Sequence, residues 1–144
     1  MEITVSPGRR LMGRLATGED LLAGLEQRGA AAGINLGAVK AIGAVSRARF
    51  GYYDQARRKY EFLELQEPLE ILALLGNVSL KDGKVMVHAH VTLADSQGRA
   101  WGGHLAEGTL VFACEYEIQE YLGEKPLSRA LDEETGLFLW PLKQ

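Results

Sequence analysis

Three histidines in this 144-residue sequence have a spacing that suits a shared metal ion. Between residues 85 and 93 an apolar residue occupies every odd position, which predicts a β-strand with one face toward the core. His88 and His90 fall on the opposite face, and residues two apart on a strand lie roughly 6 to 7 Å apart at Cα. Imidazoles at that spacing can converge on one ion, with about 2.0 to 2.1 Å from the ion to each nitrogen.

The third histidine, His104, joins this pair if residues 95–99 form a hairpin loop. Ala94 would then pair with Ala100, and counting along the two strands places His90 opposite His104. Residues that face each other across an antiparallel ladder share a face, so all three imidazoles would lie together. A loop shorter by one residue would instead turn His104 toward the core.

Glycines and polar residues around this hairpin also fit a ligand site. Gly98 suits a position of positive φ within the loop, and Gly102 and Gly103 leave room beside a ligand. Histidines that bind metal usually donate their second ring N–H to an outer partner. Candidates for that partner are Glu70, Asn77 and Ser79, which the sequence alone does not place.

The number and type of these ligands favour a transition metal. Three neutral nitrogens with an open fourth position are typical of a catalytic or adaptable zinc site. Nickel, copper and iron also accept imidazole, so zinc is the first of several divalent metals to consider. Because protons compete for the same nitrogens, we expect metal occupancy to fall below about pH 6.5. The alternative is three ordinary histidines on a solvated strand face, but the register of the third favours the metal site.

The elements that position these histidines are mostly predicted strands. One helix is expected, with Thr17 as its N-cap, Asp20 near the positive end of its dipole and Gly33 as its stop. Residues 69–75 are apolar enough for burial on both faces. A helix packed on a mostly antiparallel sheet predicts an α+β fold. The predicted strands are residues 9–16, 38–53, 60–65, 69–75, 85–94 and 100–121, with bends near Gly43 and Gly51 and a bulge near Gly108.

Length and composition describe a single domain over residues 1–144. The sequence has no repeat or linker-like stretch, and the apolar tail at residues 137–140 should pack back on the domain or on a neighbour. No apolar run approaches the roughly 20 residues of a membrane helix, and the N-terminus lacks the features of a signal peptide. Cys114, the single cysteine, lies in an apolar run, so we expect a buried thiol and a cytoplasmic protein.

The charge of the chain gives little support to nucleic-acid binding. The formal net charge is −3, whereas affinity for phosphate backbones depends on clustered Lys and Arg. The densest basic stretch is better explained as a solvated face with ordinary surface ion pairs. It consists of Arg47, Arg49, Arg57, Arg58 and Lys59.

Several short motifs, taken in order, resemble the plants-and-prokaryotes conserved (PPC) domain over about residues 8–122. They are Gly18-Glu19-Asp20, Ala41-Ile42-Gly43-Ala44-Val45, Gly51-Tyr52-Tyr53-Asp54, Leu69-Glu70-Ile71-Leu72, Gly76-Asn77-Val78-Ser79, Asp82-Gly83, His88-Ala89-His90 and Gly102-Gly103-His104-Leu105. Each motif is weak alone, but the ordered set is specific. The resemblance implies an antiparallel sheet with a helix packed on it, assembly as a homotrimer, and metal binding through the three histidines.

Stand-alone prokaryotic members of this family often carry a DNA-binding name, which derives from plant relatives with a separate AT-hook. This sequence departs from those relatives at two places. Gly8-Arg9-Arg10 is not the Arg-Gly-Arg-Pro core of an AT-hook. Glu67-Pro68-Leu69 stands where the plant proteins have Gly-Arg-Phe before Glu-Ile-Leu. Both departures weaken the transfer of DNA binding and of the plant partner-binding motif.

Three functions stay open at this point. The first is a trimeric metal-binding module, without established catalysis, that binds a small molecule or a protein partner. The second is a zinc-dependent hydrolase, in which the metal lowers the pKa of bound water to about 7 and a carboxylate such as Glu70 acts as base. The third is a DNA-binding regulatory protein. The sequence assigns no catalytic residue beyond this.

Overall fold

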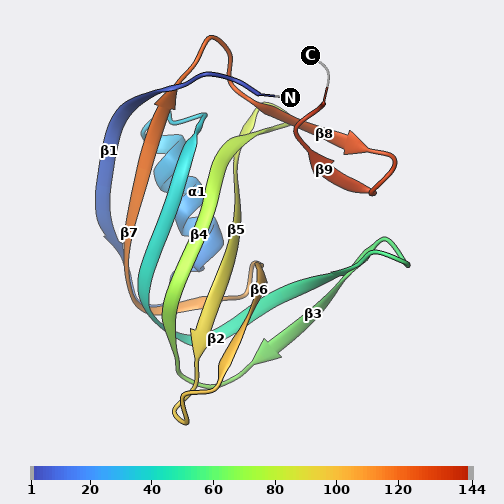
Figure 1. The fold of residues 1–144 in the computed structure, drawn as a ribbon. Coiled ribbons are helices and arrows are strands. Elements are labelled where there is room, and N and C mark those ends of the chain that lie inside the picture. The colour runs from blue at the N-terminus through green and yellow to red at the C-terminus, as the bar shows by residue number, and fades with distance from the viewer. Residues whose placement is uncertain (1, 143–144) are drawn as a thin grey trace.

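The computed structural model describes residues 2–142 and consists mainly of strands (Figure 1). Within these residues nine strands accompany one helix of 11 residues, so the predicted α+β class is wrong and the fold is mainly β. The reason is that short turns connect most strands after the helix and leave no room for another helix. The elements are β1 (Ser6–Leu15), α1 (Leu21–Ala31), β2 (Gly37–Asp54), β3 (Lys59–Leu65), β4 (Leu69–Lys81), β5 (Lys84–Ala94), β6 (Ala100–Leu105), β7 (Leu110–Leu122), β8 (Ser128–Asp132) and β9 (Leu137–Leu139).

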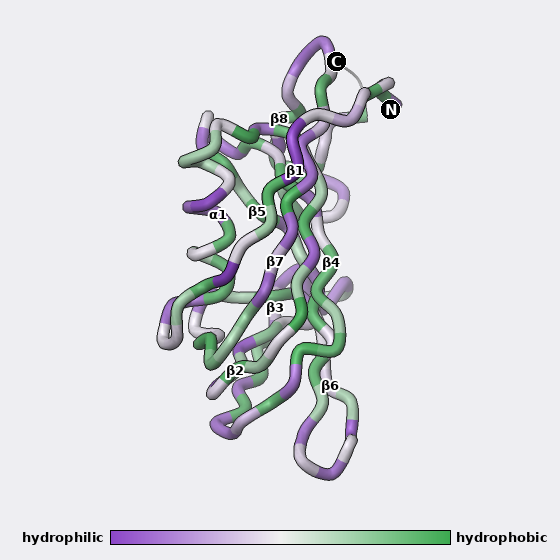
Figure 2. Tube along the Cα trace, turned by 90° about the vertical axis from the view of Figure 1, so that its left-hand side faces the viewer, coloured by the Kyte–Doolittle hydropathy of each residue, from purple (hydrophilic) through white to green (hydrophobic). Residues whose placement is uncertain are grey.

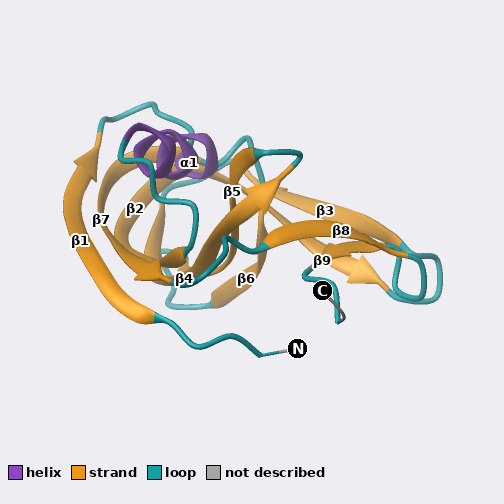
Figure 3. Ribbon diagram, turned by 90° about the horizontal axis from the view of Figure 1, so that it is seen from above, coloured by secondary structure: helices purple, strands orange, loops and turns teal. Residues whose placement is uncertain are grey.

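The strands form one strongly curved sheet (Figures 1 and 3). Neighbours pair in the order β1-β7-β2-β6-β5-β4-β8-β9, and β3 pairs with β2. Because β2 also pairs with β4, the strands β2, β4, β5 and β6 close into a ring. A bulge between Ala41 and Gly43 bends β2, whose first half pairs with β4 and β7 and whose second half pairs with β3 and β6. The bend predicted at Gly43 is therefore confirmed.

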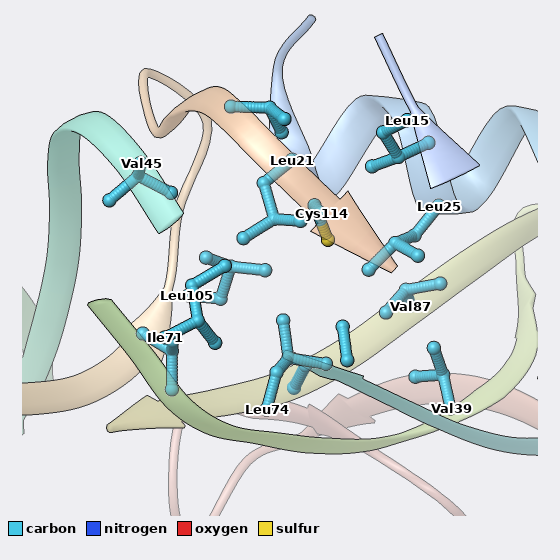
Figure 4. Close-up of a cluster of buried hydrophobic side chains, with 14 of the residues drawn as sticks. Leu15, Leu21, Leu25, Val39, Val45, Ile71, Leu74, Val87, Leu105 and Cys114 are labelled. Atoms are coloured by element: carbon cyan, nitrogen blue, oxygen red, sulfur yellow. The ribbon is translucent and has the colours of Figure 1, made fainter. Parts of the chain in front are cut away.

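Helix α1 lies inside the curve of the sheet and covers the hydrophobic core (Figures 3 and 4). Leu21 and Leu25 on the helix are fully buried, and Leu74 and Leu93 on the sheet are at most 1% exposed. Burying a leucine side chain of this kind stabilises the fold by about 1.5–3 kcal/mol relative to leaving it exposed. Cys114 lies among these side chains, so the predicted buried thiol is confirmed.

The N-terminus of α1 differs from the prediction by three residues. Asp20, and not Thr17, is the N-cap, because its carboxylate accepts a hydrogen bond from the Ala23 N–H at 3.0 Å. The second carboxylate oxygen of Asp20 accepts from the Gly108 N–H at 2.6 Å and ties the helix to the start of β7. Thr17 donates its hydroxyl to the Phe112 carbonyl instead.

Two predicted strands also need correction. Residues 100–121 form two strands, β6 and β7, because the chain turns between them. The buried Thr109 hydroxyl fixes this turn by accepting from the Arg49 N–H and donating to the Arg49 carbonyl. Strand β4, largely hydrophobic in Figure 2, is not buried on both faces: Leu72 and Leu75 are 55% and 66% exposed.

The apolar tail forms β9, which pairs with β8 in a C-terminal hairpin (Figure 1). This hairpin joins the sheet through a short parallel pairing of β8 with the end of β4. It also contacts the far end of β2, where the Tyr53 hydroxyl donates to the Thr135 carbonyl at 2.6 Å. Helix α1 is too short to cross a bilayer, and residues 2–142 contain no other helix that could do so.

Candidate metal centre

The β5–β6 hairpin brings the three histidines together on the sheet face opposite the buried side chains of β5. Ala94 pairs with Ala100 and His90 with His104, which confirms the register predicted from a loop at residues 95–99. His104 also pairs with Gly51 on β2, so its backbone position is set from both sides.

Asp95 fixes the loop that sets this register. Its side chain accepts hydrogen bonds from the Gln97 N–H at 2.8 Å and the Trp101 indole N–H at 3.2 Å, and it forms an ion pair with Arg99 at 2.7 Å. Desolvation alone would raise the pKa of Asp95, but the bonds from Arg99 and Trp101 outweigh it and hold the pKa well below its usual value. Gly98 has φ of 75°, as predicted for this loop.

The potential ligand nitrogens of His88, His90 and His104 lie within 4.8 Å of one another. The ring centroids are 5.0 to 5.7 Å apart; His88 and His104 are half-buried, whereas His90 is exposed. A tetrahedral zinc ion with bonds of about 2.0–2.1 Å needs nitrogens about 3.3 Å apart. Small side-chain rotations therefore suffice to close the three rings around an ion.

Arg129, on β8, lies directly behind the histidines and has no counterpart among the residues predicted from the sequence. Its guanidinium donates to Asn77 Oδ1 at 2.7 Å and to Ser79 Oγ at 3.0 Å. One of its nitrogens is 3.4 Å from His88 Nδ1, and the whole residue is 8% exposed. Asn77 and Ser79, two of the candidate outer partners, thus bind Arg129, which in turn contacts His88. Asn77 also faces His88 across the β4–β5 ladder.

Burial and neighbouring positive charge keep the inner histidines neutral. Burial, the charge of Arg129 and the other two histidines lower the pKa of His88 from 6.5 to about 4. Burial is also the main cause of a lowered pKa at His104, with His90 and Arg129 contributing. Metal ligation requires neutral imidazole. The environment therefore prepares these two nitrogens for a metal and moves the expected loss of metal to lower pH than the ordinary value of about 6.5 suggests.

An orphaned ring nitrogen supports the fit of a metal to these residues. His104 Nδ1 is buried and has no hydrogen-bond partner within residues 2–142. Leaving a buried polar atom unpaired is unfavourable by about 1–3 kcal/mol. A cation held by the imidazole set would use such nitrogens, and imidazole is a preferred ligand of zinc, copper, nickel and iron.

Other residues predicted for the site lie elsewhere or act differently. Glu70 pairs with Ala94, seven positions along β4 from Asn77, which at about 3.3 Å per residue is more than 20 Å away. A Cβ at Gly102 would meet the Val91 carbonyl at 2.4 Å, and one at Gly103 would meet the Gly51 carbonyl at 2.5 Å. Glycine at these two positions therefore permits close pairing of the strands. The prediction that both glycines leave room for a ligand gave a different reason for their presence.

The basic stretch forms the surface ion pairs that were predicted for most of its members. Arg49 pairs with Glu64, and Lys59 pairs with Glu61 at 2.9 Å. Arg57 pairs with Asp54 and Glu61. Arg47 donates to the Gly108 carbonyl instead. Arg58 differs from the others, because it turns toward a hollow of about 310 Å³ that reaches His88 and His104.

Residues 2–122 match the Plants and Prokaryotes Conserved (PCC) domain, the family that the sequence motifs resemble. The chain belongs to this family. The match ends before β8 and β9, so Arg129 and the rest of the C-terminal hairpin lie outside the matched residues.

Several solved structures of similar length share this fold over nearly the whole chain. The "metal-containing protein AF0104" of Archaeoglobus fulgidus is 44% identical, with a TM-score of 0.92 over 98% of this chain and 99% of its own. A plant- and prokaryote-conserved (PPC) protein of Pyrococcus horikoshii is 36% identical, with a TM-score of 0.91 over 98% of this chain and 96% of its own. A protein of Ralstonia eutropha JMP134 with a provisional DNA-binding name is 27% identical, with a TM-score of 0.79 over 91% of this chain and 90% of its own.

A curated relative contains a similar segment within a much longer protein. The "Bifunctional protein GlmU" of Synechococcus sp. (strain JA-3-3Ab) is 39% identical over 124 residues, which is 85% of this chain but 19% of that protein. The chain therefore spans about a fifth of the length of this relative.

Proposed function

We propose that this chain is a metal-binding module that holds zinc, or another divalent transition metal, at His88, His90 and His104. One observation carries the proposal: three ligand nitrogens from two paired strands lie within 4.8 Å of one another. The name of the 44% identical A. fulgidus protein, which is metal-containing, supports it. Zinc held by three histidines would have an open fourth coordination position, which a water molecule or an anion can fill. The protein uses this position to bind a small molecule.

The exposed face of the sheet supports association between copies of the chain. Met12, Ile42 and Leu75 are 78%, 58% and 66% exposed and line a hollow of about 420 Å³ on this face. Apolar side chains gathered in this way are typical of association surfaces. Leu75 pairs directly with His90, so association here would also cover the exposed histidine. The number of three subunits comes from resemblance to the family, and a cytoplasmic location accords with the buried, free Cys114.

The two other functions have less support in the structure. Among the residues that line the 310 Å³ hollow beside His88 and His104, none is Asp or Glu, and Glu70 is far away. A hydrolase would thus lack the carboxylate base proposed for it. The provisional name of the R. eutropha protein is the support for DNA binding. Against it, Arg49, Arg57 and Lys59, three of the five residues in the basic stretch, already form ion pairs with carboxylates of the chain.

Metal analysis of protein purified without a His-tag tests the main proposal. We expect one metal per chain, and loss of that metal in His104→Ala. Thr92→Ala is a matched control, because Thr92 is exposed on the same face of β5 and pairs with Gly102. Absence of stoichiometric metal from the parent protein, or equal metal in His104→Ala, would show that the histidines do not form a metal site.

Two simpler measurements address the partners. Light scattering should give a mass of three chains, and Leu75→Glu should reduce it to one, whereas Leu131→Glu on the C-terminal hairpin should leave it unchanged. Both leucines are more than half exposed, so neither change disturbs the core. For DNA, binding curves at low and physiological salt suffice, since no binding at about 50 mM salt excludes a functional contact with phosphate backbones.

A further inference from the structure

The hollow beside His88 and His104 is lined by positive charge. Its volume of about 310 Å³ lies at the lower end of small-molecule sites. Arg58, from the β2–β3 turn, Lys59, from β3, Lys81, from β4, and Arg129, from β8, line it from separate parts of the chain. No Asp or Glu belongs to this lining, although the sequence has 19 acidic and 16 basic residues. The local charge is thus opposite in sign to the net charge of the protein.

Three of these cations have no carboxylate partner. Lys59 pairs with Glu61, but Arg58, Lys81 and Arg129 form no ion pair within residues 2–142. Their contacts are with neutral groups: Arg58 donates to the Glu133 carbonyl, and Lys81 Nζ lies 3.6 Å from the centre of the Phe138 ring. Arg129 donates to two neutral side chains and to the Phe138 carbonyl. Within residues 2–142 no carboxylate therefore compensates the charge of these three cations, of which Arg129 is buried and Arg58 is exposed at the rim of the hollow.

The positive charge lining this hollow favours an anionic ligand. Arg129 is almost fully buried, and a buried charge without a counterion is strongly unfavourable. A divalent metal on three neutral imidazoles would add two further positive charges beside it. A phosphate dianion offsets more of this charge than one carboxylate does, because it brings two charges and several acceptor oxygens for the N–H donors of the three cations.

We infer that the hollow binds a small anion of the phosphate class, either inorganic phosphate or a compact phosphate monoester. The phosphoryl oxygens lie among Arg58, Lys81 and Arg129, and they would contact an ion held by the three histidines. The rings of Tyr60 and Phe138 flank the space left for an organic group. The metal contact in this arrangement rests on the proposed function; the contacts with the three cations do not.

Calorimetry with two phosphate probes and one control anion tests the inference. Untagged protein, with and without one equivalent of zinc, is titrated with phenyl phosphate, inorganic phosphate and acetate in a buffer free of phosphate. We expect both phosphates to bind and acetate to bind at least tenfold more weakly. Lys81→Met and Arg58→Met should each weaken phosphate binding by about tenfold, because each removes a charge-assisted contact. Lys125→Met removes the same charge outside the hollow and should change nothing.

The outcomes separate this inference from the proposed metal function. Stoichiometric zinc with no phosphate binding, or with phosphate binding unaffected by Lys81→Met and Arg58→Met, overturns the anion site and leaves the metal module intact. Phosphate binding that depends on Lys81 in protein that takes up no metal supports the anion site while the metal function fails. Preference for phenyl phosphate over inorganic phosphate identifies an ester as the ligand, and the reverse preference identifies the free ion.

Discussion

The hairpins β5–β6 and β8–β9 meet at the histidine cluster but are anchored in different ways. The first is part of the closed ring of strands: β5 pairs with β4 along its whole length, and β6 pairs with β2. The second pairs with the sheet at two positions, Leu80 with Ser128 and Lys81 with Arg129, and is otherwise held by side-chain hydrogen bonds of Tyr53, Arg58 and Arg129. The first hairpin carries all three histidines on its two strands, and the second carries Arg129, which contacts His88. A part of the fold held by continuous backbone pairing thus presents the ligands, while a part held mainly by side-chain contacts adds the charge of Arg129 beside them.

The largest effect expected from this difference concerns stability. Leu93 on β5 is fully buried, so Leu93→Ala should lower the free energy of unfolding by about 2–5 kcal/mol. Leu139 on β9 is partly exposed, and Leu139→Ala should cost about 1 kcal/mol or less. Urea unfolding followed by circular dichroism measures both, with the slope of the transition as a check on two-state behaviour. Equal losses would show that the C-terminal hairpin belongs to the same cooperative core as β5.

The next effect is the pH at which metal is lost. Because the pKa of His88 is lowered to about 4, protons compete with metal at this nitrogen only well below pH 6.5, and the pKa of His104 is lowered in the same direction. We expect the zinc-loaded protein to retain most of its metal at pH 6 and to release it nearer pH 5. Release can be followed with a chromogenic zinc indicator after equilibration at each pH. Half-release near pH 6.5 would contradict the electrostatic account of the site.

The same pKa shift predicts how the metal-free protein responds to acid. The unfolded chain takes up a proton on His88 near its ordinary pKa of 6.5, whereas the folded protein does so only near about 4. The stability of the metal-free protein should therefore fall as the pH drops from about 6.5 to about 4. A histidine that was exposed in the folded state would give no such dependence.

A smaller effect isolates the contribution of the second hairpin to the first. Arg129→Met removes the charge next to His88 and should raise the pKa of His88 only part of the way to 6.5, because burial is the larger cause of the shift. The pH at which metal is released should rise with it. NMR titration of the His88 ring protons measures the change, and Arg57→Met, which removes an exposed charge, is the control. An unchanged pKa would mean that the arginine does not act on the histidine.

The two hairpins also differ in how far the sequence predicts them. The register of β5 and β6 follows from a period of two and the length of one loop, both of which are local properties. The contact between Arg129 and His88 joins residues 41 positions apart, and the tail in which Arg129 lies has no motif that points to the histidines. Glu70 is a candidate outer partner on residue type alone, and the strand register places it at the far end of β4 from Asn77. The α+β class is wrong because a single helix does not make a layer; the pattern locates most strands but misses the turn between β6 and β7 and the whole of β8.

The smallest effect concerns two tryptophans, Trp101 on β6 and Trp140 directly after β9. The Trp101 indole N–H donates to Asp95 at 3.2 Å, whereas the Trp140 indole N–H is buried and has no partner within residues 2–142. Trp101→Phe should destabilise the protein, because it removes a bond to the carboxylate that fixes the loop. Trp140→Phe removes an unsatisfied donor and keeps an aromatic ring beside Arg129, so it should change the free energy of unfolding by less than about 1 kcal/mol, in either direction. Urea midpoints of the two variants measure the contrast. A loss in Trp140→Phe as large as that in Trp101→Phe would show that the Trp140 N–H finds an acceptor in solution and adds to the contacts that hold the C-terminal hairpin.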